Sequence, residues 1–278
     1  MRKQLAAFAD EAADTLKGQI TALKENNIPC LEIRNVNGKS IADLSVPETK
    51  EIKKQLDAEN ITVWSIGSPY GKISIYDDFA PHLDAYKHGL ELAEILDTRH
   101  LRLFSFYIPD PALPETGLHD LVMERLSQFI EAARGYNITL CHENEKGIYG
   151  SSIVHCLEIH QNFPEIKAVF DPANFIQCGQ DTMTAWKSLS PFVEYMHIKD
   201  ARPDGFVVPA GEGCGNISAL LQEYRGAVLT VEPHLAVFSG LSGLEKEKID
   251  RDKFVYSSRT DAFRAAVEAL KKLMQEDA

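Results

Sequence analysis

The sequence predicts a single (β/α)8 barrel, the TIM barrel fold, over residues 1–278. Short apolar runs alternate with longer amphipathic segments eight times along the chain. Runs that are apolar throughout are typical of parallel strands whose two faces are both buried. The length of 278 residues also fits, because such barrels usually occupy about 250 residues as one domain. These observations together favour one barrel that fills the chain.

The eight apolar runs are the strand candidates. They lie at residues 5–9, 30–34, 61–66, 100–105, 138–142, 168–171, 193–198 and 228–232. A doubly wound sheet is the alternative arrangement, and it usually has a glycine-rich turn after its first strand. The sequence Phe-Ala-Asp-Glu at residues 8–11, where the first candidate strand ends, contains no glycine. The barrel is therefore the better prediction.

Helical spacing of apolar residues fills the gaps between the strands. Leu16, Ile20 and Leu23 predict the first helix, and Ser45 with Glu48 predicts a capping box ahead of the second. Further helices are expected around residues 83–96, 121–133, 153–160, 186–189, 217–221 and 263–274. The stretch 239–253, rich in glycine, lysine and glutamate, is expected to be a long loop after the eighth strand.

The composition excludes several classes of partner. Asp and Glu number 41 against 29 Lys and Arg, which gives a net charge of −12. Nucleic-acid backbones are bound by clustered basic residues, so neither a nucleic acid nor an anionic membrane surface is an expected partner. No stretch reaches the roughly 18–20 apolar residues of a membrane span. Five cysteines without a C-x-x-C motif, and an N-terminus without an apolar signal core, predict a cytoplasmic protein with reduced thiols.

Polar residues end four consecutive predicted strands. They are Glu143, Asp171, His197 and Glu232. Strand ends meet at one mouth in a barrel, and three carboxylates placed together there would repel one another without a cation. Three carboxylates with one imidazole suit Mn²⁺ best, with Mg²⁺, Co²⁺ or Zn²⁺ as alternatives. The sequence therefore predicts a divalent metal site, and the alternative is a set of unrelated polar strand ends.

An ordered set of short motifs carries a family resemblance. The motifs are LEIR at 31–34, the strand that leads to Glu143, FDPAN at 170–174, HIKD at 197–200, GEG at 211–213 and EPH at 232–234. The chain resembles the sugar isomerases and epimerases with a xylose isomerase-like barrel. That superfamily includes ketose 3-epimerases, sugar-phosphate 3-epimerases, hydroxypyruvate isomerase, inosose dehydratase and endonuclease IV. The resemblance covers most of the chain and is specific for the superfamily, not for one activity.

The resemblance implies that Glu143, Asp171, His197 and Glu232 are metal ligands and that the two glutamates act as acid and base. The activity it implies is that of a sugar or sugar-phosphate isomerase or epimerase. Such an enzyme moves a proton next to a ketose carbonyl through a metal-stabilised enediolate. Two bases suit an epimerase, but a 1,2-isomerase can use one, so the pair does not separate the two.

Two other functions remain alternatives for such a site. One is an inosose dehydratase-like lyase on the same metal site, and the other is a non-catalytic barrel that binds a sugar or a metal. A DNA repair enzyme like endonuclease IV is disfavoured by the acidic charge. The resemblance also implies a small-molecule sugar substrate, phosphorylated or free, and a homo-oligomer.

Six further residues are candidates for substrate binding. They are Glu32, Ser68, Lys72, Asn174, Lys199 and Arg202. Purely structural roles are the alternatives: an ion pair for Glu32 and Lys199, and a turn or solvated loop for those in loops. Asn174 stands where several free-ketose epimerases carry a histidine, which leans the resemblance towards the sugar-phosphate branch.

Overall fold

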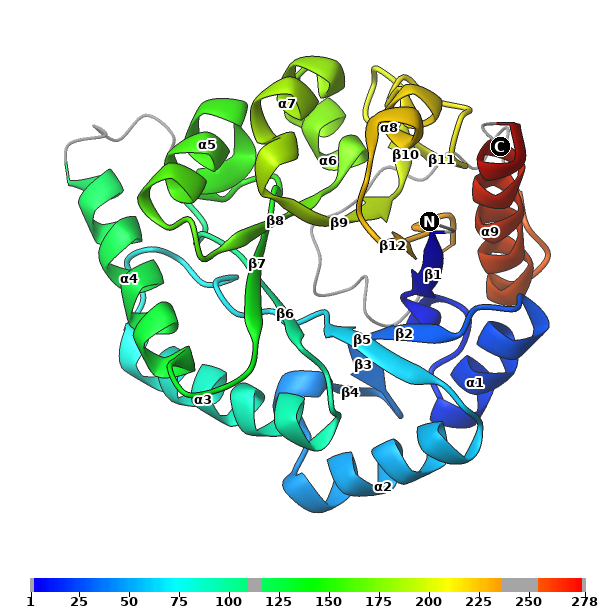
Figure 1. Ribbon diagram of the computed structural model, residues 1–278, viewed down its shortest axis with the longest axis horizontal. Coiled ribbons are helices and arrows are strands. Elements are labelled where there is room, and N and C mark those ends of the chain that lie inside the picture. Colours follow the sequence, from blue (N-terminus) through cyan, green and yellow to red (C-terminus); the bar gives the residue numbers. More distant parts are fainter. Residues whose placement is uncertain (1–2, 110–116, 237–254, 277–278) are drawn as a thin grey trace.

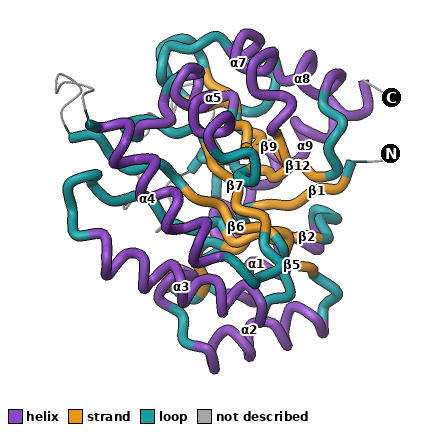
Figure 2. Tube along the Cα trace, turned by 60° about the vertical axis from the view of Figure 1, so that its left-hand side comes forward, coloured by secondary structure: helices purple, strands orange, loops and turns teal. Residues whose placement is uncertain are grey.

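A closed barrel of eight parallel strands forms the centre of the molecule, with the helices arranged around it (Figure 1; the tube in Figure 2 gives a second view). The computed structural model describes residues 3–109, 117–236 and 255–276. The strand order around the barrel is β1-β12-β9-β8-β7-β6-β5-β2. The strands are β1 (Gln4–Ala7), β2 (Cys30–Ile33), β5 (Thr62–Ile66), β6 (His100–Leu103), β7 (Thr139–Glu143), β8 (Lys167–Phe170), β9 (Val193–Ile198) and β12 (Val228–Val231). The predicted fold is confirmed.

Every predicted helical segment coincides with a helix. The helices are α1 (Leu16–Glu25), α2 (Val46–Ala58), α3 (Phe79–Ile95), α4 (Leu118–Ala133), α5 (Ile153–Asn162), α6 (Pro172–Gln177), α7 (Thr182–Leu189), α8 (Ile217–Glu223) and α9 (Arg259–Glu276). The capping box of Ser45 and Glu48 at the start of α2 is confirmed. The short helix α6 was not predicted, although Asp171 caps it and Pro172 occupies its first position, which are both start signals.

Small elements decorate the loops between the barrel strands. Four short strands form two antiparallel pairs: β3 (Asn35–Val36) with β4 (Lys39–Ser40), and β10 (Asp200–Ala201) with β11 (Val207–Val208). The described residues also contain four single turns of 3₁₀ helix: η1 (Ala9–Glu11), η2 (Ile41–Asp43), η3 (Tyr149–Ser151) and η4 (Ser190–Phe192). The predicted loop at 239–253 lies outside the described residues.

The observed strands differ from the predicted ones in their ends, and they differ from one another in how many residues pair with each neighbour. The predicted strand 100–105 is shorter in the structure, because beyond Leu103 the backbone turns to bond the loop after β5. There the N–H of Phe104 donates to the carbonyl of Tyr70. The ladders differ in length: β6 and β7 pair over four positions, whereas β5 and β6 pair at one and β1 and β2 at two. The barrel therefore has two short ladders.

The period of two along each strand stacks the barrel interior in layers. An apolar layer lies at the lower end, made by Ala6, Cys30, Cys141, Val169, Tyr195 and Val228. Two residues further along four of these strands stand Glu32, Glu143, Asp171 and His197. The apolar residues thus form a floor, and the polar residues form the layer above it. The helices cover the outside of the strands with residues such as Leu23, Leu56 and Leu90, which are completely buried.

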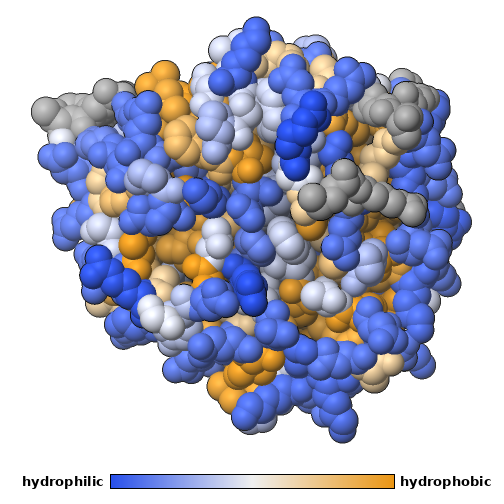
Figure 3. Space-filling model, in the orientation of Figure 1, coloured by the Kyte–Doolittle hydropathy of each residue, from blue (hydrophilic) through white to orange (hydrophobic). Residues whose placement is uncertain are grey.

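The face of the molecule drawn in Figure 3 is mostly polar. Figure 3 shows a largely hydrophilic face with smaller hydrophobic patches between the polar side chains. Among the described residues, no helix combines the length and the apolar character that crossing a bilayer requires. All five cysteines are free thiols, and three of them are buried: Cys30, Cys141 and Cys156.

A buried histidine pair, His142 on the barrel strand β7 and His160 on α5, predicts that the protein is destabilised by acid. His160 on α5 is 1% exposed, with Nδ1 3.1 Å from the carbonyl of Ile166 and its ring 5.9 Å from that of His142. Burial lowers the pKa of His160 to about 4, against an ordinary value of 6.5. The unfolded chain therefore takes up the proton first. The stabilisation is complete above about pH 6.5 and is lost as the pH falls towards 4.

We expect the His160→Gln variant to lose less stability than the wild type between pH 7 and pH 5. The free energy of unfolding that is lost between the two pH values should be about 2 kcal/mol smaller in the variant than in the wild type. Glutamine keeps a donor for the Ile166 carbonyl but does not titrate. Urea unfolding at the two pH values measures this, and equal pH dependence in the two proteins would contradict it.

Candidate metal centre and active site

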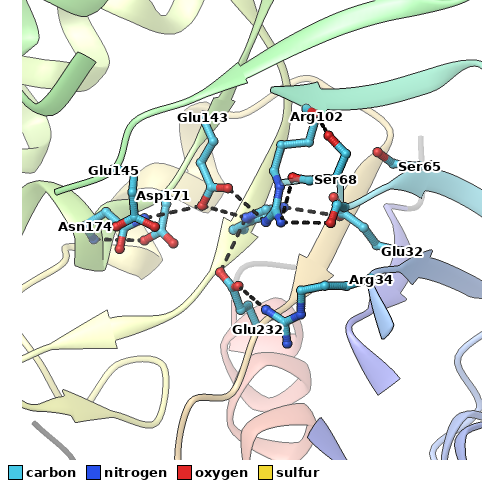
Figure 4. Close-up of polar contacts among 12 residues, drawn as sticks. Glu32, Arg34, Ser65, Ser68, Arg102, Glu143, Glu145, Asp171, Asn174 and Glu232 are labelled. Atoms are coloured by element: carbon cyan, nitrogen blue, oxygen red, sulfur yellow. Dashed lines mark hydrogen bonds and ion pairs between the residues drawn. The ribbon is translucent and has the colours of Figure 1, made fainter. Parts of the chain in front are cut away.

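The four predicted ligand residues converge on one point. Glu143, Asp171, His197 and Glu232 each offer a ligand atom, and these atoms all lie within 4.8 Å of one another. The residues come from the ends of the neighbouring strands β7, β8, β9 and β12, so barrel closure brings together positions that are up to 89 residues apart. All four are at most 3% exposed. Figure 4 shows the two glutamates approaching the same space from opposite sides in that view.

Each glutamate has one oxygen towards His197 and the other towards an arginine. Glu143 Oε1 lies 3.0 Å from His197 Nδ1, and its Oε2 accepts a 3.0 Å hydrogen bond from Arg102. Glu232 Oε2 lies 3.4 Å from His197 Nδ1, and its Oε1 accepts a 3.0 Å hydrogen bond from Arg34. The guanidinium groups fix how the two carboxylates are turned. One oxygen of each carboxylate is thereby presented to the shared space.

Asp171 has a double role at the end of β8. Its Oδ1 accepts the backbone N–H of Asn174 at 3.0 Å and so caps α6. Its Oδ2 faces the cluster, 3.2 Å from Lys199 Nζ, with no well-aligned hydrogen bond from the described residues. Burial raises the pKa of Asp171 to about 7; Lys199 opposes the rise, and the charges of Glu232 and Glu143 add to it.

Lys199 is an internal cation of the cluster. Its Nζ lies 3.4 Å from Glu232 Oε2 in addition to its contact with Asp171, and its side chain is 2% exposed. Burial alone would raise the pKa of Glu232, but Lys199 and His234 outweigh it and hold that pKa well below its usual range. Lys199 therefore has the ion pair that was one of its two predicted roles.

The cluster has the composition of a divalent cation site. Three carboxylates and one imidazole nitrogen give the oxygen-rich donor set that hard divalent cations prefer. The buried Asp171 Oδ2, which lacks a well-aligned donor, points into the same space as the other ligand atoms. Burial is the main cause of the raised pKa of Asp171, and the negative charges of Glu232 and Glu143 add to it. A divalent ion would relieve this repulsion, so the residues present could hold one.

A second network beside the cluster was missed by the sequence analysis. Arg34 donates to Asp10 from Nε at 3.0 Å and to Glu11 from Nη2 at 3.1 Å, and it also holds Glu232. His234 Nε2 lies 3.3 Å from Glu232 Oε1. Asp10 and Glu11 directly follow the predicted first strand, residues 5–9, so the strand-end rule would have found them if it had been applied there.

Arg102 was also missed by the sequence analysis. Besides holding Glu143, it donates from Nη2 to the carbonyl of Gly67 at 3.0 Å, across the one-position ladder of β5 and β6. It is 4% exposed in the middle of a strand. A buried arginine requires hydrogen-bond acceptors, so an arginine within a predicted buried strand was the sequence signal that could have identified this residue.

The loop candidates for substrate binding already have protein partners. Ser68 is completely buried and donates to the backbone carbonyl of Arg102. Lys72 Nζ lies 2.9 Å from Glu145 Oε2, above the ring of Phe104. Arg202 pairs at 3.0 Å with Asp204, and its side chain is 35% exposed. These contacts fit the structural alternatives, and substrate binding by the three stays a prediction.

Asn174 lies beside the cluster. Its Nδ2 is 3.3 Å from Glu143 Oε1 and 3.0 Å from the carbonyl of Asn144. Its Oδ1 is buried and has no hydrogen-bond partner among the described residues. A buried amide oxygen without a donor is costly, so a hydroxyl group from a substrate or a water would find an acceptor here.

Asp200 connects two of the sequence motifs, HIKD at 197–200 and GEG at 211–213. Its carboxylate accepts four backbone N–H groups, from Ala201 and Gly215 at 2.8 Å, Gly211 at 3.0 Å and Gly213 at 3.1 Å. A Cβ on Gly213 would lie 2.3 Å from the carboxylate, so this position requires glycine. The loop after β11 is thereby wrapped around Asp200, which follows Lys199 directly in the chain.

We expect Asp200→Asn to lower the free energy of unfolding by about 2–3 kcal/mol, because the amide NH₂ would face two N–H donors. Asp204→Asn, at an exposed position in the neighbouring turn, is the matched control and should leave the urea midpoint unchanged. Equal midpoints for Asp200→Asn and the wild type would refute the structural role of Asp200.

The sequence of the chain matches one known protein family over most of its length. The sequence model of the family described as xylose isomerase-like TIM barrel matches residues 20–273. The chain belongs to this family. No curated protein matches the chain.

Several solved structures share the fold of this chain at low sequence identity. The probable 3-DHS dehydratase AsbF from Bacillus anthracis has a TM-score of 0.74 and 16% identity, covering 98% of this chain and 99% of its own. The IOLI protein, described with a bound zinc atom, has a TM-score of 0.74 and 13% identity, covering 99% of each chain. A D-tagatose 3-epimerase-like protein has a TM-score of 0.73 and 18% identity, covering 99% of this chain and 100% of its own. At these identities the likeness shows the fold alone.

Proposed function

We propose that the protein is a divalent-metal-dependent isomerase or epimerase of sugars or sugar phosphates, with Glu143 and Glu232 as acid and base. The observation that carries the proposal is the placement of two buried glutamates on opposite sides of one cluster, each with an oxygen towards His197. The ion is expected to be held by these three residues and Asp171. When bound, a divalent cation supplies the positive charge that stabilises an enediolate.

The residues divide the work of a proton transfer. Glu143 removes or returns the proton next to the carbonyl from one side, and Glu232 does so from the other. Arg102 and Arg34 hold the second oxygen of each glutamate, so neither carboxylate turns away from the cluster. The Oδ1 of Asn174 accepts a substrate hydroxyl. Lys199 balances the negative charge that develops near Asp171 and Glu232.

Two measurements test the proposal. Metal analysis after reconstitution with Mn²⁺, the ion we expect, should find a divalent ion bound, and its absence would reject the site. NMR in D₂O with ketoses, their phosphates and inososes should then show exchange at a carbon next to the carbonyl. Loss of water from an inosose would instead establish the lyase alternative. Binding without exchange would establish a non-catalytic barrel.

A further inference from the structure

A column of hydrogen bonds runs through the barrel interior beneath His197. Ser65 Oγ lies 3.1 Å from Tyr195 Oη, and Tyr195 Oη donates to Glu32 Oε1 at 2.8 Å. The second oxygen, Glu32 Oε2, lies 3.2 Å from His197 Nε2. These four side chains are completely buried. The column therefore joins the lower end of the barrel to the candidate metal centre.

We propose that Glu32 is a positioning residue that, held by Tyr195, accepts the Nε2–H of His197 and so presents Nδ1 to the metal. The inference rests on the proposed function, since it concerns the same centre. Both nitrogens of His197 face carboxylates, Nε2 that of Glu32 and Nδ1 that of Glu143. A neutral imidazole carries one N–H, and the nitrogen that binds a metal is the one without it, so a metal ion at the cluster leaves the N–H on Nε2, towards Glu32. Nδ1, which lies 3.0 Å from Glu143 Oε1, is then left with its lone pair towards the cluster.

The geometry assigns this role to Glu32 in preference to the predicted substrate contact. Both of its oxygens already have partners: Oε1 accepts from Tyr195, and Oε2 lies 3.2 Å from His197 Nε2. To bind a substrate, Glu32 would have to give up one of these bonds inside a closed interior. A histidine ligand of a metal usually donates its other N–H to a carboxylate, which fixes the ring and makes the ligand more basic.

Tyr195 makes the orientation of Glu32 definite. Its hydroxyl proton goes to Glu32, so its oxygen takes the proton of Ser65. Its ring meets the ring of Trp64 edge-on at 5.9 Å and that of His197 at 5.5 Å. The tyrosine is thus fixed by packing as well as by hydrogen bonds. Removing its hydroxyl frees one oxygen of Glu32 without changing any charge.

Calorimetric titration of the full-length protein with Mn²⁺ tests the inference. We expect Glu32→Leu to bind Mn²⁺ about 100-fold more weakly than the wild type and Glu32→Gln about 10-fold more weakly. Glutamine can still accept the Nε2–H, but it lacks the charge. Tyr195→Phe should fall between the wild type and Glu32→Gln.

Thr230→Val is the matched control. Thr230 lies beside His197 in the β9–β12 register, and its buried hydroxyl has no hydrogen-bond partner among the described residues. Valine has nearly the same shape, so this variant should bind Mn²⁺ with wild-type affinity. If it loses as much affinity as Glu32→Gln, the effect is a general disturbance of the interior and the inference is overturned.

NMR of the Zn²⁺-loaded protein with ¹⁵N-labelled histidine gives a readout that a merely structural role would not move. The His197 Nε2–H should be shifted downfield and exchange slowly in the wild type and in Glu32→Gln, and it should lose both properties in Glu32→Leu. If Glu32→Leu does not fold, Glu32→Gln and Tyr195→Phe still carry the affinity test.

The outcomes separate the two proposals. Wild-type Mn²⁺ affinity in the Glu32 variants overturns the positioning role while the metal centre stands. A wild-type protein that binds neither Mn²⁺ nor Zn²⁺ rejects the proposed function and the positioning role with it. Binding with normal affinities but no exchange on any ketose rejects the isomerase and leaves the role of Glu32 in place.

Discussion

Replacing either glutamate by glutamine should reduce substrate conversion by about 10²–10⁴-fold, the usual contribution of a positioned acid or base. In Glu143→Gln and Glu232→Gln the amide keeps the size of the side chain and can still accept from Arg102 or Arg34, but it cannot take up a proton. The measurement is the rate of product formation in D₂O with the ketose that proves active, together with the deuterium content of substrate and product.

The deuterium pattern also distinguishes one base from two. With a base on each side, one of the two variants should still exchange the substrate proton without forming product, while the other does neither. Glu194→Gln is the control, because this carboxylate on β9 is partly exposed and pairs with His100 at 3.1 Å, away from the cluster. Normal conversion by both active-site variants would refute the assigned roles.

Replacing Arg34 by methionine should lower the free energy of unfolding by about 3–5 kcal/mol, the usual cost of breaking a buried ion pair. Arg34 is 8% exposed and serves three carboxylates, those of Asp10, Glu11 and Glu232. The methionine side chain keeps the packing against the ring of Phe8, which lies 4.3 Å from the guanidinium. The loss therefore reports the charge and not the volume.

Urea unfolding at pH 7 measures the effect. Lys24→Met is the control, because Lys24 pairs with Glu59 on the surface and both side chains are more than 40% exposed. Its unfolding midpoint should stay at the wild-type value. An Arg34→Met midpoint equal to that of the control would show that the network contributes little to folding.

The fold could be predicted from the sequence because its signals are local. A short window of sequence is enough to recognise an apolar run of four to six residues, or a helix with apolar residues every three or four positions. The eightfold repetition of this pair of elements then predicted the barrel. The positions of Glu143, Asp171, His197 and Glu232 followed from one further step, since strand ends meet at one mouth. Their convergence within 4.8 Å then required only that the barrel close.

The partners of these residues could not be predicted in the same way. Arg34 and Glu232 are 198 positions apart, and nothing near either of them in the sequence names the other. Glu32 shows the same difficulty: its partner Tyr195 belongs to a strand that reads as apolar, and the contact spans 163 residues. Which way a buried charged side chain turns depends on acceptors that only the closed barrel brings into reach.

The two short ladders of the barrel acquire a meaning beside the two arginines. Arg102 bridges from β6 to the carbonyl of Gly67 after β5, and Arg34 bridges from the end of β2 to η1 after β1. At each of these seams, side-chain charge replaces backbone pairing. Local opening of the barrel should therefore start at these two seams. Amide hydrogen exchange there should depend on whether Glu143 and Glu232 are ionised and whether they hold a metal ion. A metal ion or substrate bound at the mouth should then slow amide hydrogen exchange in the strands that flank the two short ladders.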